Sequence, residues 1–240
     1  MADYSTSLRT QYLEARSHIN NVSTEFRLDR NTLYTSNLRL INVGLNRAAA
    51  DAACTYPPVS GILSLFKNVR LMDGSKELSS LRNADKYLAF KNLNQPNEKM
   101  QNINDILHKS RGSQELYVDG SIRQSGEGSN AITTVANKSD EHFGYVDLRL
   151  ILPLLSNLQA LDTMVFKNLR LVIEYNSDSR LVTSKDNVTV TVNQPTLVAD
   201  EVINNDKMNM LRKASLGNFV WNEIEHDVFI IPAFTVAHGG

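Results

Sequence analysis

Apolar and polar residues alternate with a period of two in short stretches along most of the chain. The clearest stretch is 169–175, in which Leu169, Leu171, Ile173 and Tyr175 alternate with Arg170, Val172 and Glu174. A period of two sends successive side chains to opposite faces of a strand, so this stretch predicts a strand with one buried face. Turn residues such as Asp73-Gly74 end such stretches after a few residues. The pattern therefore favours many short antiparallel strands.

Several other stretches share this alternation, and one helix interrupts them. Strands are expected at 33–45, 62–72, 143–152, 188–192 and 197–203, with shorter ones at 116–118, 132–135, 219–221 and 228–231. A phase slip in the first predicts a β-bulge near Leu40, and Leu78, Leu81 and Leu88 permit a helical turn. Pro153 and the leucines that follow predict a short helix near 153–162. Seven or eight strands with one inserted helix are typical of an all-β antiparallel sandwich.

The N-terminus has a different spacing. Leu8, Tyr12, Ala15 and Ile19 follow one another at intervals of four, three and four residues, which places them on one face of a helix. A helix this short needs a surface on which to bury that face. Two interpretations remain open: the helix packs on its own domain, or it is an arm that docks on a neighbouring subunit through these four interface candidates.

Composition excludes several classes of protein. The 25 Lys and Arg residues balance 26 Asp and Glu residues, and the net charge of −1 gives no positive field for direct nucleic-acid binding. No apolar stretch is long enough for a membrane-spanning helix, and residues 1–10 resemble no secretory signal. Cys54 is the single cysteine, so an intrachain disulfide is excluded and a reducing compartment is expected.

No residue pattern predicts catalysis, a cofactor or a metal. The five histidines, His18, His108, His142, His226 and His238, are isolated from one another. Glu223 and His226 have the spacing of a bundle metal motif, but they lie in a strand-like stretch, where solvated side chains are the simpler interpretation. Arginines at 39, 70, 149 and 170 alternate with apolar neighbours and are expected on the outer faces of strands. We therefore expect a structural protein and nominate no catalytic, cofactor-binding or metal residue.

The order of the segments resembles a known family. A strand ending at 68–74 (NVRLMDG) is followed much later by 145–155 (YVDLRLILPLL), a short helix, and 168–175 (NLRLVIEY). This order is similar to the first jelly roll of double jelly-roll major capsid proteins of eukaryotic double-stranded DNA viruses, in the lineage of polinton-like viruses, virophages and nucleocytoplasmic large DNA viruses. In that family a short helix lies between two late strands, where residues 153–162 fall here. The resemblance covers about residues 24–232.

The resemblance implies a jelly-roll sandwich and a place in a virion. It implies an N-terminal arm at 1–23, a jelly-roll domain at 24–205 and a C-terminal segment at 206–240 that links to a second roll. It further implies homotrimeric, pseudo-hexameric capsomers in an icosahedral shell, synthesised in the host cytoplasm. The implied partners are sister copies, neighbouring capsomers, minor capsid proteins and an inner membrane.

Three interpretations of the chain therefore remain open. Family members are about twice as long, so the chain is either half of a double-roll protein or a complete single-roll penton or minor capsid protein. A β-sandwich that binds a glycan or receptor is the third. Trp221 with Asn222 and Glu223 is the candidate platform for such a ligand, although a core position suits a lone tryptophan as well.

Overall fold

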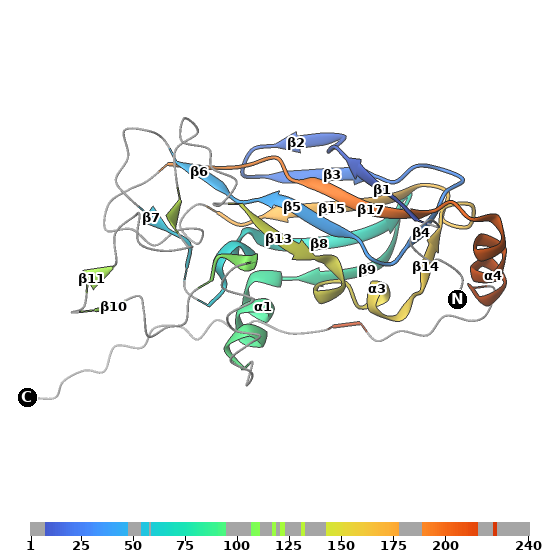
Figure 1. Ribbon diagram of the computed structural model, residues 1–240. Helices are drawn as coiled ribbons and strands as arrows, with labels where there is room; N and C mark the ends of the chain where they lie inside the picture. Colours follow the sequence, from blue (N-terminus) through green and yellow to red (C-terminus); the bar gives the residue numbers. More distant parts are fainter. Residues whose placement is uncertain are drawn as a thin grey trace, which may run out of the picture.

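Two antiparallel sheets face each other across one core (Figure 1). The computed structural model describes residues 8–47, 54–57, 59–94, 107–110, 117–118, 121–122, 131–132, 143–177, 189–215 and 223–224. One principal sheet has six strands and the other has five. The predicted all-β sandwich is confirmed.

The six-stranded sheet is built around β17. Its strands are β1 (Leu8–Leu13), β4 (Leu33–Thr35), β5 (Arg39–Val43), β13 (Gly144–Asp147), β14 (Ala160–Asp162) and β17 (Thr196–Val202). β17 pairs with β1 on one side and with β4 and β5 on the other. β5 and β4 in turn pair with β13 and β14. Consecutive strands β4 and β5 thus act as one interrupted strand, as do β13 and β14.

The five-stranded sheet has the order β2-β3-β15-β8-β9. Its strands are β2 (Ser17–Ile19), β3 (Ser23–Arg27), β8 (Phe66–Asp73), β9 (Lys76–Arg82) and β15 (Leu169–Tyr175). β15 lies between β3 and β8 and pairs with both over most of its length. The strand with the clearest alternation is therefore central in its sheet.

The strand order is that of a jelly roll. If the short β2 is left out, and β4–β5 and β13–β14 are each counted as one strand, the two principal sheets contain eight strands. Numbered along the chain, these strands have the order 1-8-3-6 in the six-stranded sheet and 2-7-4-5 in the five-stranded sheet. The first strand pairs with the eighth, the second with the seventh, the third with the sixth and the fourth with the fifth. This nested antiparallel pairing, rolled into two sheets, defines the jelly-roll sandwich.

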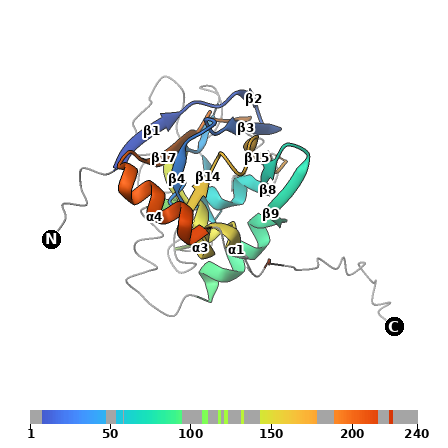
Figure 2. The same cartoon turned by 90° about the vertical axis from the view of Figure 1, so that its right-hand side faces the viewer.

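Short helices and three small sheets complete the described residues. The helices are η2 (Gly61–Leu65), α1 (Ala84–Leu93), η5 (Leu148–Leu150), α3 (Pro153–Asn157) and α4 (Asn205–Ser215). The small sheets pair β6 (Leu45–Arg47) with β16 (Val190–Val192), β7 (Cys54–Thr55) with β12 (Ala131–Ile132), and β10 (Tyr117–Val118) with β11 (Ser121–Ile122). α1 and α3 lie along one long side of the sandwich, and α4 lies at one end (Figures 1 and 2).

The core lies between the two inner faces. In β15, Leu169, Leu171, Ile173 and Tyr175 are buried, whereas the three residues between them are partly exposed. The facing sheet contributes Leu40, Val146, Leu161, Leu197 and Ala199 to the same cluster. The period-two pattern therefore gave the correct inward face for β15, whereas in β13 Val146 is buried in place of the expected Tyr145.

The predicted N-terminal helix is wrong. Residues 8–13 form β1, which pairs with β17 along its whole length, and residues 17–19 form β2, which pairs with β3. Both strands belong to the sheets, so the sandwich begins by Leu8 and not at residue 24. Deleting residues 1–22 would remove β1 and β2 and would not isolate an arm.

Four boundaries also differ from the sequence prediction. Residues 61–65 form η2 ahead of β8, residues 76–82 form a strand, and residues 148–150 form η5. The helix after Pro153 ends at Asn157, and residues 160–162 return to the sheet. The bulge predicted near Leu40 is confirmed: it lies between Leu40 and Val43, where Asn42 has φ of 59°. Asparagine tolerates this left-handed conformation better than most residues.

The C-terminal region is described in part. Residues 205–215 form α4, for which the sequence analysis offered no element. The strands expected at 219–221 and 228–231 lie outside the described residues, and so does most of the polar stretch from 95 to 142.

Candidate interaction surface

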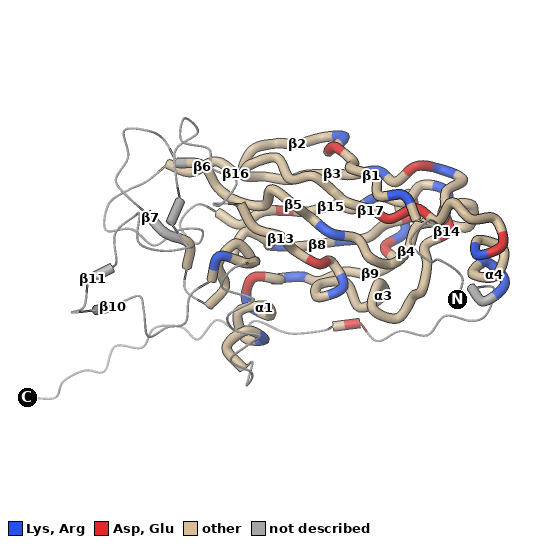
Figure 3. The backbone as a smooth tube through the Cα atoms, in the orientation of Figure 1, with Lys and Arg blue, Asp and Glu red and all other residues tan. Residues whose placement is uncertain are grey.

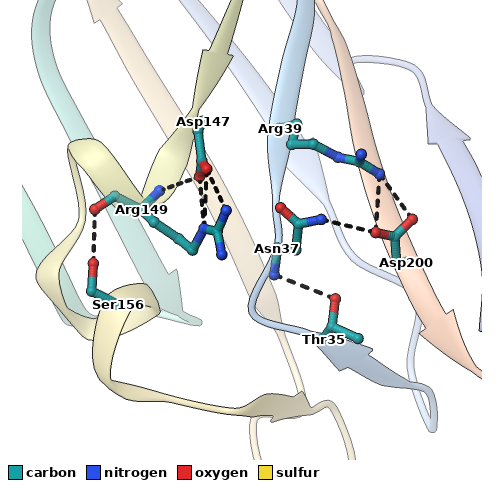
Figure 4. A network of polar contacts seen from close by, with 7 residues as sticks. All are labelled: Thr35, Asn37, Arg39, Asp147, Arg149, Ser156 and Asp200. Carbon is teal, nitrogen blue, oxygen red and sulfur yellow. Dashed lines mark hydrogen bonds and ion pairs between the residues drawn. The ribbon is translucent and has the colours of Figure 1, made fainter. Parts of the chain in front are cut away.

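The outer face of the six-stranded sheet carries a network of polar side chains centred on Asp200 (Figure 4). Asp200 Oδ1 and Oδ2 accept hydrogen bonds from Arg39 Nη2 at 2.9 and 3.0 Å. Asn37 Nδ2 and the Thr10 hydroxyl donate to the same carboxylate at 3.1 and 2.8 Å. The Asp200 side chain is only 12% exposed, so the network is largely shielded from water. It ties together β17, β5 and β1.

A second pair on this face is local. Arg149 and Asp147 form a bidentate ion pair, and Asp147 Oδ1 also accepts a hydrogen bond from the backbone nitrogen of Arg149. The hydrogen bond to Asp147 raises the pKa of Arg149. Burial, followed by the charge of Asp147, raises the pKa of the neighbouring Tyr145. Both groups thus keep their neutral-pH charge states, and this pair fixes η5 at the end of β13.

These two pairs are expected to differ in their contribution to stability. Asp200→Ala should lower the free energy of unfolding by about 2 kcal/mol, because it leaves a shielded guanidinium without its anion. Asp147→Ala should cost about 1 kcal/mol or less, since Arg149 is almost half exposed and water replaces the carboxylate. Urea denaturation of both variants at pH 7 measures the difference. Equal losses would contradict a shielded network at Asp200.

The outer face of the five-stranded sheet is also lined with ion pairs. Glu174 accepts hydrogen bonds from Arg70 and from Asn68 Nδ2, the latter at 2.6 Å. Arg170 contacts Glu25 at 3.4 Å and donates to the carbonyl oxygen of Gly74 at 2.5 Å. Positive and negative residues are scattered along otherwise uncharged strands in both sheets (Figure 3). The predicted outward placement is confirmed for Arg39, Arg70 and Arg170; Arg149 is also exposed, but lies in η5 rather than in a strand.

α4 covers one end of the six-stranded sheet. Met208 and Leu211 pack against Leu33, Ala160 and Val202. Its first turn is capped, because Asn204 Oδ1 accepts hydrogen bonds from the backbone nitrogens of residues 206 and 207 at 3.0 and 3.1 Å. Near its end, Arg212 Nε donates to Asp162 Oδ2 at 2.8 Å. α4 is therefore anchored to the sandwich through Met208, Leu211 and Arg212.

The four interface candidates lie along the edge that β1 and β2 form. Tyr12 is 68% exposed and Ile19 is 54% exposed, whereas Leu8 is 38% exposed. Ala15 is partly buried against the core. The candidates thus belong to strands and to the link between them, and three of the four are accessible to a partner. Val22, in the turn after β2, adds a further exposed apolar side chain at this edge.

Two buried polar sites lie inside the sandwich. His18 Nδ1 and Tyr175 Oη both lie within hydrogen-bond distance of the Thr24 hydroxyl, at 2.8 and 2.6 Å, and burial raises the pKa of Tyr175 to about 12. His108 is 3% exposed, its Nδ1 has no hydrogen-bond partner among the described residues, and burial lowers its pKa to about 4. Tyr175 and His108 are therefore neutral at pH 7, and both side chains are buried.

The residues weighed for catalysis are not brought together where the structure describes them. No group of three His, Cys, Asp or Glu side chains among the described residues is arranged to hold a metal ion. Glu223 lies beside β9, where its carboxylate accepts a hydrogen bond from the Ser79 hydroxyl at 3.3 Å. His142, Trp221, His226 and His238 lie outside the described residues. Among the helices that the structure describes, none has the length and apolar character to cross a membrane.

Most acidic partners on the outer faces could not be predicted from local sequence pattern. Asp200 and Asp162 are distant in sequence from Arg39 and Arg212, and the sequence offers no signal for these pairings. Glu174 is an exception, because its place opposite the buried residues of β15 indicated an outward side chain.

No protein-family model and no curated protein matches the chain. One solved structure with a similar chain path is the capsid of the PBCV-1 virus, described as a quasi-atomic model. The two chains are 12% identical with a TM-score of 0.42, over 85% of this chain and 44% of the other. The chain therefore spans less than half the length of that capsid chain. A TM-score this low does not by itself establish a common fold, so the jelly roll is identified by its strand pairing.

Proposed function

We propose that this protein is a structural building block of a viral capsid, a jelly-roll subunit of trimeric, pseudo-hexameric capsomers in the icosahedral shell of a double-stranded DNA virus. The observation that carries the proposal is the complete jelly-roll pairing, since viral capsid subunits are a principal use of this fold. Because one fold serves many functions, the proposal needs support from the surface as well.

The surface of the described residues agrees with this role. The outer faces hold cross-strand ion pairs that stiffen the sheets, such as Arg39 with Asp200 and Arg70 with Glu174. The other large classes of jelly-roll proteins bind a metal or a sugar in a dedicated site. Among the described residues, no group of three His, Cys, Asp or Glu side chains is arranged to hold a metal ion. A rigid sandwich with a mixed-charge surface suits contacts with sister copies and minor capsid proteins better than it suits binding of nucleic acid.

Oligomeric state provides the first test. In native mass spectrometry over a range of concentrations, we expect the purified chain to form trimers, because the proposed capsomer holds three copies of the protein around one axis. A chain that remains monomeric at every concentration and binds a component of a glycan array would contradict the proposal and favour a recognition module. A closed ring of five copies would instead favour a single-roll penton protein.

A further inference from the structure

Within the described part of the chain, one backbone edge of strand β1 has no partner strand. Six residues of β1 pair with β17 on one side, and no described strand pairs with the other side. Such an edge presents a row of backbone donors and acceptors to any second strand. Proteins usually protect edge strands with charges, interruptions or covering segments.

The other edges of the two sheets are protected in these ways. β9 is covered in part by residues 223–224, where Glu223 accepts a hydrogen bond from the backbone nitrogen of Ser80 at 3.4 Å and Ile224 packs on the core. The edge formed by β13 and β14 is interrupted by η5 and α3. β2 is three residues long. Among the described residues, β1 is therefore the longest edge strand that is neither interrupted nor covered by another described segment, and it lies at the margin of the sandwich (Figure 2).

No uncompensated charge guards β1. Its one charged residue, Arg9, donates to Glu201 of β17 at 2.8 Å through Nε. Gln11 Nε2 donates to the same carboxylate at 2.7 Å. The nearest acidic group on the other face, Asp200, is already paired with Arg39. A second strand can approach this edge without facing a like charge, and Leu8 and Tyr12 are exposed beside it.

We propose that β1 pairs with β1 of a second copy of this chain, antiparallel about a two-fold axis at Thr10. Leu8, Thr10 and Tyr12 share the outer face, because their partners Val202, Asp200 and Val198 alternate with the core residues Leu197 and Ala199. Directly opposed residues of an antiparallel pair share a face, so each outer residue must oppose an outer residue.

One register satisfies this condition and matches apolar groups. With Thr10 opposite Thr10 of the partner subunit, each Leu8 opposes a Tyr12, and Arg9 opposes Gln11. Aromatic–aliphatic and Thr–Thr pairs are favourable cross-strand combinations. If the partner strand slides so that Arg9 lies opposite its own copy, like charges repel. If it slides the other way, so that Gln11 lies opposite its own copy, Tyr12 opposes Thr10 and the aromatic–aliphatic pairs are lost. The chosen register thus joins the six-stranded sheets of two copies into one sheet.

This inference deepens the proposed function, because it names a surface for contact between subunits. A two-fold contact cannot close a three-fold capsomer, so β1 pairing joins subunits of different trimers. The exposed apolar candidates Leu8 and Tyr12 then lie in a seam between capsomers.

Disulfide trapping tests the register directly. In a Cys54→Ser background, Thr10→Cys should yield a covalent dimer under mild oxidation, because directly opposed residues have the Cα separation that a disulfide needs. Leu8→Cys and Tyr12→Cys are matched controls on the same face. Each alone should give at least about tenfold less dimer than Thr10→Cys, whereas a mixture of the two proteins should cross-link. Equal cross-linking of all three single variants, or none with Thr10→Cys, would overturn the inference.

Charge reversal gives a second readout. Leu8→Lys/Tyr12→Lys should abolish association through β1, because it places two cations opposite each other, whereas Leu8→Glu/Tyr12→Lys should restore it. Both variants should keep the thermal midpoint of unfolding of the parent, since these side chains are exposed. If trimers form but Thr10→Cys does not cross-link, β1 pairing is refuted and the capsomer proposal remains. Cross-linked dimers that never form trimers would refute the capsomer and leave β1 pairing in place.

Discussion

Gly61→Ala is expected to lower the free energy of unfolding by about 2–5 kcal/mol. Gly61 has φ of 53°, a conformation that costs a residue with a Cβ atom more than it costs glycine. An added Cβ would also lie 2.0 Å from the carbonyl oxygen of His108 and 2.7 Å from the backbone nitrogen of Ser110. Because both are backbone atoms, residues 107–110 must move away from η2. Urea denaturation at pH 7 measures the loss.

Gly74→Ala is the matched control for this substitution. Gly74 has φ of 60°, nearly the same as Gly61, but an added Cβ would meet only Asn168 Nδ2, at 3.9 Å. Its cost should be about 1–2 kcal/mol, the contribution of the backbone conformation alone. Hydrogen exchange at residues 107–110 should accelerate in Gly61→Ala and remain unchanged in Gly74→Ala. If both variants lose the same stability, then residues 107–110 do not pack closely on η2.

The central strands were predictable because burial and alternation coincide there. β15 pairs with a strand on each side and buries one face, so its sequence shows a clear alternation of apolar and polar residues. β1 was not predictable in this way, since Leu8 and Tyr12 are exposed and only Leu13 packs on the core. Its spacing also matches a helical face, and pairing with β17, almost two hundred residues away, decides between the two structures.

α4 shows a signal that was present but weak. Asn204 is a good helix cap, and Met208 and Leu211 are spaced to share one helical face. Two apolar residues are too few to predict a helix unless the surface that they cover is known. That surface is formed by Leu33, Ala160 and Val202, which come from three distant strands. Long-range partners of this kind, like the pairing of Arg39 with Asp200, follow from the fold and not from local pattern.

Acid is expected to destabilise the fold through His108. Burial lowers the pKa of His108 to about 4 from its ordinary value of 6.5. The unfolded chain therefore binds this proton more readily than the folded chain, and stability falls as the pH falls from 6.5 through 4. This site should remove about 2 kcal/mol by pH 5 and about 3 kcal/mol by pH 4, relative to pH 7.

His108→Leu isolates this contribution from that of the carboxylates. Leucine fills a similar volume and does not titrate. It also removes the buried Nδ1 of His108, which has no hydrogen-bond partner among the described residues. The difference in unfolding free energy between His108→Leu and the parent, measured by urea denaturation from pH 7 to pH 4, should grow by about 3 kcal/mol in favour of the variant, because the carboxylate contributions cancel. A difference that stays constant over this range would mean that His108 is accessible to water in the folded protein. Since His108 and Gly61 are in backbone contact, the same result would also contradict the close packing that Gly61→Ala tests.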